Sequence, residues 1–162
     1  MIVVSDTSPL RYLVLIEAEG ILPAMFRRIL VPPAVIEELR HSSAPVAVAA
    51  WAASPPAWLE IQAPADLATT TALGRGEIQA IAFALETPTN ALLVDDHKAR
   101  RAAAVRGIVT IGTVTILEHA ALKNLLSLSE AFRRLRRTNF RCTDRLLAAA
   151  LERDEASKRS SG

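Results

Sequence analysis

Five short runs of consecutive apolar residues predict buried strands along the chain. The clearest runs cover residues 2–4, 91–94 and 108–111, and weaker ones cover 29–31 and 58–61. Continuous rather than alternating apolarity is typical of parallel strands that are covered on both faces. We therefore expect a central, mostly parallel sheet of four to five strands.

Helical spacing of apolar residues fills most of the chain between these runs. The predicted helices cover residues 33–41, 45–53, 76–86, 97–106, 114–125, 128–137 and 143–153. Strands that alternate with helices of about ten residues favour right-handed crossovers and a three-layer α/β/α sandwich. We expect a single α/β domain over residues 1–154, and a disordered tail over the polar end, residues 155–162.

Composition excludes two classes of protein. The chain has 162 residues, of which 51% are hydrophobic, but charged residues interrupt every apolar run before the roughly 18 residues that a membrane span needs. We therefore expect no membrane association. One cysteine, Cys142, excludes a disulfide scaffold. With no basic, apolar leader after Met1, the sequence predicts a cytoplasmic protein.

The net charge of +2 is unevenly distributed. Residues 123–145 hold seven basic and only two acidic side chains, and 16 of the chain's 19 basic residues are arginine. Arginine's planar guanidinium suits phosphate partners. Two interpretations stay open: the stretch is a solvated helix face, or it binds RNA phosphates with Phe140 stacking on bases. The spacing of Phe132, Leu135 and Phe140 also fits plain core packing.

Acidic residues follow two of the predicted strands. Asp6 follows the first strand, and Asp95 and Asp96 follow the strand at 91–94. Ligands of open parallel sheets bind outside the carboxyl ends of the strands, so these acids predict one shared site. Alternatively, Asp6 and Asp96 only cap the helices that follow them. Capping does not need two adjacent acids, which leaves Asp95 for another role.

Two predicted helices add a glutamate each. In the helix at 33–41, the apolar face places Glu38 at its edge and turns Glu37 away from it. Glu77 flanks the apolar face of the helix at 76–86 and follows Gly74 and Gly76, which permit a close approach of the chain. An acid in a first helical turn is also favourable by itself, so this simpler role of Glu77 stays open.

Four carboxylates at one sheet edge repel each other unless a cation neutralises them. Three scattered histidines and one cysteine offer no zinc cluster. Hard carboxylate oxygens favour Mg²⁺ or Mn²⁺, which also bridge to phosphate oxygens. The chemistry that follows is metal-assisted phosphodiester hydrolysis, in which the cation activates water and stabilises the departing oxygen. Whether one or two cations bind is left open.

The motifs stand in a distinctive order: Asp6-Thr7-Ser8, then residues 35–39, 74–80 and 92–96, and finally Gly112-Thr113. From residue 2 to about residue 151, this order resembles the PIN-domain nucleases, and within them the VapC-like toxins. The resemblance implies an Mg²⁺- or Mn²⁺-dependent ribonuclease. The residues it implies are the metal-holding acids Asp6, Glu38, Glu77 and Asp95, the further acid Asp96, and the supporting residues Thr7, Ser8 and Thr113.

The resemblance also implies a homodimer that a small antitoxin inhibits by lying across the active site. One departure concerns Val94, which stands where family members often have Thr or Ser before the first acid of the pair. It leaves open whether Asp95 or Asp96 is the direct ligand.

Two other classes of protein place acids on an α/β sheet, but this chain lacks residues that each of them needs. A signalling receiver domain needs an acid pair after the first strand and a lysine after the last, where this chain has Gly112-Thr113. A haloacid-type phosphatase needs Asp-x-Asp after the first strand, but position 8 is serine. A catalytically inactive PIN-like module that binds RNA or a protein partner is the remaining alternative, because a fold alone does not establish activity.

Overall fold

The computed structural model describes residues 1–65 and 73–162. Internal contacts divide the chain into two units, Met1–Thr113 and Val114–Gly162, and each is described by itself. The expectation of one domain over residues 1–154 stays a prediction. In the part of the chain that the structure describes, no helix is long and apolar enough to cross a membrane.

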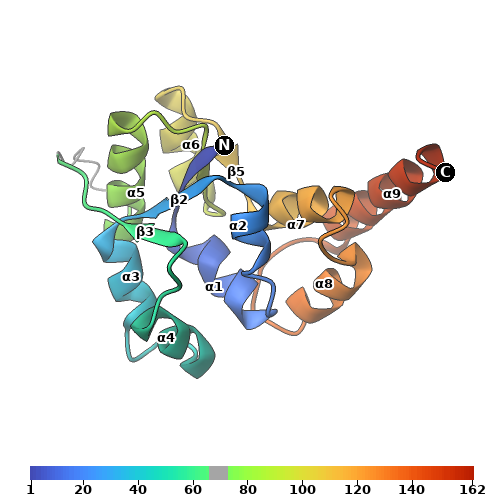
Figure 1. Cartoon of the computed structure of the whole chain (residues 1–162), viewed down its shortest axis with the longest axis horizontal. Helices are drawn as coiled ribbons and strands as arrows, with labels where there is room; N and C mark the ends of the chain where they lie inside the picture. Colours follow the sequence, from blue (N-terminus) through green and yellow to red (C-terminus); the bar gives the residue numbers. More distant parts are fainter. Residues whose placement is uncertain (66–72) are drawn as a thin grey trace. The chain divides into compact units, whose positions relative to one another are not determined.

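The first unit is built on a five-stranded, entirely parallel sheet (Figure 1). Its strands are β1 (Ile2–Ser5), β2 (Arg28–Val31), β3 (Leu59–Ile61), β4 (Ala91–Leu93) and β5 (Thr110–Ile111). Their order is β3-β2-β1-β4-β5, which confirms the predicted α/β class and all five strand positions. The strand predicted over 108–111 is shorter, because only its last two residues pair with β4.

The strand order creates a natural site between β1 and β4. The chain leaves β1 toward β2 on one side of the sheet, whereas β4 and β5 continue on the other side of β1. A crevice opens at the carboxyl ends of the strands where the order reverses in this way. Asp6 follows β1 and Asp95 follows β4, so the fold delivers both acids to this point.

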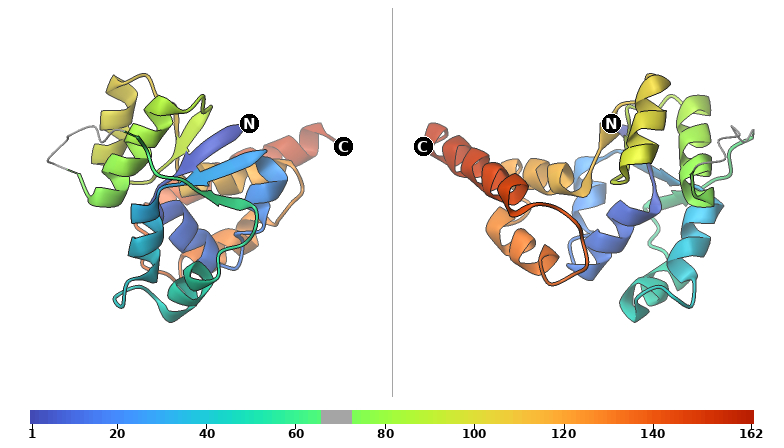
Figure 2. Two further views of the ribbon diagram at one scale, coloured as in Figure 1. Left: turned by 60° about the vertical axis from the view of Figure 1, so that its left-hand side comes forward. Right: turned by 180° about the vertical axis from the view of Figure 1, so that it is seen from behind.

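In the described residues of the first unit, the helices around the sheet are α1 (Thr7–Leu15), α2 (Ile21–Met25), α3 (Pro33–Arg40), α4 (Val46–Ala53), α5 (Arg75–Glu86) and α6 (His97–Val105). Val4, Leu30 and Leu92 are paired neighbours on one face, where α5 and α6 pack against them. Figure 2 shows α5 and α6 together on one side of the sheet and α1 on the other.

Two helices, α1 and α2, were not predicted from the apolar pattern. The helix α1 starts directly after Asp6 and has Pro9 in its first turn, where proline lacks no helical hydrogen bond. Leu10 and Leu13 of α1 are fully buried. The Asp-Thr-Ser-Pro start was the available signal for a helix N-terminus.

The second unit contains α7, which begins at Thr113 and ends at Leu122, α8 (Leu128–Leu135) and α9 (Asp144–Ser160). Phe132 and Leu135 of α8 are buried, so the core interpretation holds for these two. Residues expected in a tail, 155–162, include the last turns of α9. This helix starts well because the Thr143 hydroxyl accepts a hydrogen bond from the Leu146 amide.

Candidate active site

Among the described acids of the first unit, Asp6 is the most deeply buried, with 4% of its surface exposed. Its backbone amide donates to the Leu93 carbonyl at 2.9 Å, which fixes it between β1 and β4. The side chain does not cap α1, and its Oδ1 is buried without a hydrogen-bond partner among the described residues. The simple capping interpretation of Asp6 is therefore wrong, and its carboxylate is left for another role.

The surroundings of Asp6 resist its ionisation. Burial is the largest cause that raises its pKa, to about 7, while the Thr7 backbone amide opposes the rise. The negative charges of Glu77, Glu38 and Asp95 raise it further. Three of the predicted acids thus lie near enough to Asp6 for their charges to act on it.

Glu38 is held at this edge by two contacts that leave it little freedom. The Thr7 hydroxyl donates to Glu38 Oε2 at 2.5 Å, and the Gly76 amide donates to Oε1 at 2.9 Å. Glu37 instead points to Arg75, with which it forms an exposed ion pair at 2.8 Å. The two neighbouring glutamates therefore have different partners, and the role of Glu38 in the site stays a prediction.

Glu77 lies in the first turn of α5. Its Oε2 accepts from the Gly74 amide at 2.9 Å, so the side chain reaches back over the first turn of the helix. Burial is the main cause that raises the pKa of Glu77, and the charges of Asp96 and Glu38 add to it. Glu77 therefore supports the helix start and also lies among the other acids.

Asp95 and Asp96 have different surroundings. Both oxygens of Asp95 are held by Thr113, whose amide donates to Oδ1 and whose hydroxyl donates to Oδ2, each at 2.7 Å. Asp96 caps α6, because its Oδ1 accepts from the Ala99 amide at 2.9 Å. Burial raises the pKa of Asp95, while the bonds from Thr113 and the charge of Arg100 lower it.

Two glycines and a serine also shape this region. Gly76 was expected to permit a close approach of the chain, whereas Gly112 and Ser5 were given no role beside the acids. A Cβ on Gly76 would lie 2.6 Å from Glu38 Oε1, and one on Gly112 would lie 3.2 Å from Asp95 Oδ1. The fully buried Ser5 donates its hydroxyl to the Asp6 carbonyl oxygen at 2.9 Å. Of the predicted supporting residues, Thr7 and Thr113 contact acids, whereas Ser8 forms no such bond among the described hydrogen bonds.

The sequence of nearly the whole chain matches a known protein family. The model of the DUF3368 family, a PIN domain, matches residues 2–156. The chain belongs to the PIN domain family. PIN domains are generally nucleases that use divalent metal ions.

A solved structure supports the same fold. A PilT N-terminus domain protein from the hyperthermophilic archaeon Sulfolobus solfataricus is similar, with a TM-score of 0.53 and 15% sequence identity. The match covers 74% of this PIN domain chain and 93% of the archaeal chain. No curated protein sequence matches this chain.

The donor set of this PIN domain fits a hard divalent cation. The charges of three other carboxylates act on Asp6, whose buried Oδ1 has no partner among the described residues, and these like charges destabilise the ionised acid. Within residues 1–65 and 73–162, no three acid, histidine or cysteine side chains converge closely enough to form a metal cluster. Backbone amides hold Glu38, Glu77 and Asp95 through hydrogen bonds.

A cavity of about 320 Å³ lies beside the acids of the PIN domain. It is lined by Ala34, Glu37, Glu38, His41, Ser43 and Arg75. The Ser43 amide donates to Nδ1 of His41 at 3.1 Å. When the ring is neutral and this bond is made, its proton is on Nε2. Glu38 belongs both to this cavity and to the acidic site.

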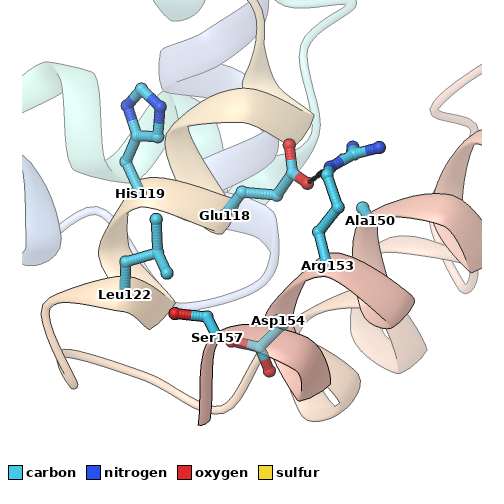
Figure 3. A pocket seen from close by; sticks show the side chains of 7 residues that line it. All are labelled: Glu118, His119, Leu122, Ala150, Arg153, Asp154 and Ser157. Atoms are coloured by element: carbon cyan, nitrogen blue, oxygen red, sulfur yellow. Dashed lines mark hydrogen bonds and ion pairs between the residues drawn. The ribbon is translucent and has the colours of Figure 1, made fainter. Parts of the chain in front are cut away.

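A second cavity, of about 350 Å³, lies in the second unit of the PIN domain protein between α7 and α9 (Figure 3). Arg153 reaches across it and donates to Glu118 Oε1 at 2.7 and 2.9 Å. The largely buried Asp154 accepts from Lys158 at 2.6 Å. These charged residues form ion pairs with one another, which gives them a structural role.

Proposed function

We propose that this PIN domain protein is a metal-dependent endoribonuclease. Asp6, Glu38, Glu77 and Asp95 are the residues that would hold an Mg²⁺ or Mn²⁺ ion, with Asp96 as a further acid. The observation that carries the proposal is Asp6, a buried acid with an unpartnered oxygen and three like charges around it. Such a site is stabilised by a cation and is otherwise unfavourable.

The contacts of each acid indicate the role that it would have at the metal site. Asp6 presents its free oxygen, while Thr7 and the Gly76 amide orient Glu38 and Thr113 orients Asp95. Asp96, engaged at the start of α6, would act mainly through its charge on Glu77. When bound, the cation would supply activation of water and stabilisation of the oxygen that leaves.

We also propose the biological setting that the resemblance to VapC-like toxins implies. In it, the protein is the cytoplasmic toxin of a type II toxin–antitoxin pair, forms a homodimer, and is silenced by a small antitoxin. The motif order from Asp6 to Thr113 supports this assignment.

Cleavage of a structured RNA pool by the purified protein tests the function. We expect cutting with Mg²⁺ or Mn²⁺ and none with a chelator. Asp6→Asn, prepared identically, controls for contaminating nucleases and should be inactive. Cutting by wild type in chelator, or equal cutting by Asp6→Asn at saturating Mg²⁺, would contradict the proposal. RNA binding without cleavage would favour the inactive binding module instead.

A further inference from the structure

The acidic site and the positive charge of the protein belong to different units. The first unit, which contains all the candidate metal-holding acids, has nine basic and eleven acidic residues. The second unit has ten basic and six acidic residues. RNA binds through phosphates that need positive partners, and the first unit has no excess of them. The second unit is therefore where a polyanion is attracted.

Six arginines of the second unit lie within thirteen residues, and all are exposed: Arg133, Arg134, Arg136, Arg137, Arg141 and Arg145. Three of them have a structural role. Arg133 and Arg134 pair with Glu130 in the last turn of α8, where positive charge is also favourable for the helix dipole. Arg136 lies 3.8 Å from Asp144.

The other three, Arg137, Arg141 and Arg145, have no such role. Within the described part of the chain, none of them forms an ion pair with an acid. Arg145 lies in the first turn of α9, where the helix dipole disfavours positive charge. By contrast, Arg153 and Lys158 of the same unit are each paired with an acid (Figure 3). The three unpaired arginines therefore have no structural role in the described part of the chain and are open to a ligand.

The chemistry of this segment fits single-stranded RNA. Arginine forms planar, paired hydrogen bonds to phosphate oxygens, which a lysine point charge does not. Phe140 lies between Arg137 and Arg141 in the connection from α8 to α9 and is half-buried. Sites for single strands combine basic side chains that follow the backbone with aromatic rings near the bases.

We propose that Arg137, Arg141 and Arg145 form a binding surface for the phosphate backbone of single-stranded RNA, outside the acidic site. This inference rests on the proposed ribonuclease function, for which it supplies the substrate-holding surface. Binding by this surface does not depend on a divalent cation, whereas cleavage does.

Fluorescence anisotropy of a labelled, unstructured RNA oligonucleotide in EDTA tests this surface, with gels to verify that the RNA stays intact. The triple variant R137Q/R141Q/R145Q is compared with R27Q/R101Q/R106Q, which removes three exposed charges from the first unit. Loss of three phosphate contacts lowers the slope of log affinity against log salt by about 2, which corresponds to a loss of about 100-fold at 0.1 M salt if affinities converge at 1 M. The control variant should keep the wild-type slope.

Three results would overturn the inference: unchanged RNA binding by the arginine variant, an equal loss in both triple variants, or no RNA binding by wild type. If the arginine variant binds RNA normally but loses binding to polyglutamate, the surface fits an acidic protein segment instead. Because binding is measured without metal, its outcome is separate from that of the cleavage assay. If wild type and the arginine variant cleave RNA equally well, the proposed binding surface is wrong and the nuclease assignment stands.

Discussion

The carboxylate of Glu38 occupies the space that a side chain at position 76 would need. A Cβ there would lie 2.6 Å from Glu38 Oε1, the same oxygen that accepts the Gly76 amide at 2.9 Å. Gly76→Ala must therefore push the Glu38 carboxylate away from its place. Because small displacements of a positioned group cost up to about 100-fold in rate, we expect RNA cleavage to fall by 10- to 100-fold.

Gly74→Ala provides the matched control for this substitution. Its Cβ would meet Glu77 Oε2 at an ordinary 3.6 Å, so cleavage should stay within a few-fold of wild type. Initial cleavage rates of the two variants, measured side by side, decide the matter. Equal rates for Gly76→Ala and wild type would show that Glu38 need not be held where it is.

The neighbours Glu37 and Glu38 should respond oppositely to loss of charge. Glu38→Gln removes a candidate metal-holding oxygen and should abolish cleavage. Glu37→Gln breaks only an exposed ion pair with Arg75, a contact worth less than about 1 kcal/mol, and should be nearly normal. Cleavage rates over a range of Mg²⁺ concentrations check this pair, and the reverse order of activities would contradict the placement of α3.

The hydroxyl of Thr113 should help Asp95 to bind the metal ion. Thr113→Val keeps the backbone bond to Asp95 Oδ1 but removes the hydroxyl that donates to Oδ2. With one oxygen freed and the pKa of Asp95 higher, we expect the Mg²⁺ concentration for half-maximal cleavage to rise by about tenfold. Thr113→Ser, which keeps a hydroxyl, should restore most of the wild-type midpoint; a value as high as that of Thr113→Val would argue against the hydrogen bond.

Metal-free protein should lose stability as the pH rises toward neutral. Burial raises the pKa of Asp6 from 3.8 to about 7, so between these values the folded state holds a proton that the unfolded state has released. The stabilisation is therefore complete below pH 3.8 and is lost as the pH rises through about 7, at up to about 1.4 kcal/mol per pH unit.

Denaturant unfolding in EDTA between pH 4 and pH 7 measures this dependence. Asp6→Asn removes the titrating group, so its stability should change less over the same range. Burial also raises the pKa values of Glu77 and Asp95, which leaves a smaller dependence of the same sign in the variant. Identical pH dependence of the two proteins would show that Asp6 ionises normally.

The sequence predicted the sheet and most helices because their signals are local. Buried parallel strands appear as apolar runs, and the edge position of Glu38 on α3 follows from helical periodicity alone. The short helices α1 and α2 were not predicted because the region between Asp6 and Arg28 contains two prolines, Pro9 and Pro23, and few polar residues to define a face.

Contacts between residues far apart in the chain could not be predicted from the sequence. The space that Gly76 leaves for Glu38 and the hold of Thr113 on Asp95 join segments that are 38 and 18 residues apart. The motif order located Thr113 only through a family resemblance, and it placed Ser8 among the supporting residues, where the structure instead shows Ser5 beside Asp6. Periodicity specifies which face a residue occupies, whereas its partner depends on packing of the whole unit.

The stability order of wild type and Asp6→Asn, with and without Mn²⁺, tests most directly whether Asp6 is the centre of a cation site. Without metal and above pH 7, where Asp6 is ionised, Asp6→Asn should melt at a higher temperature, because it removes a buried charge from among like charges. With Mn²⁺ at about 100 times its dissociation constant, wild type should gain about 2.7 kcal/mol and become the more stable protein. An equal shift of both proteins by Mn²⁺ would contradict the account.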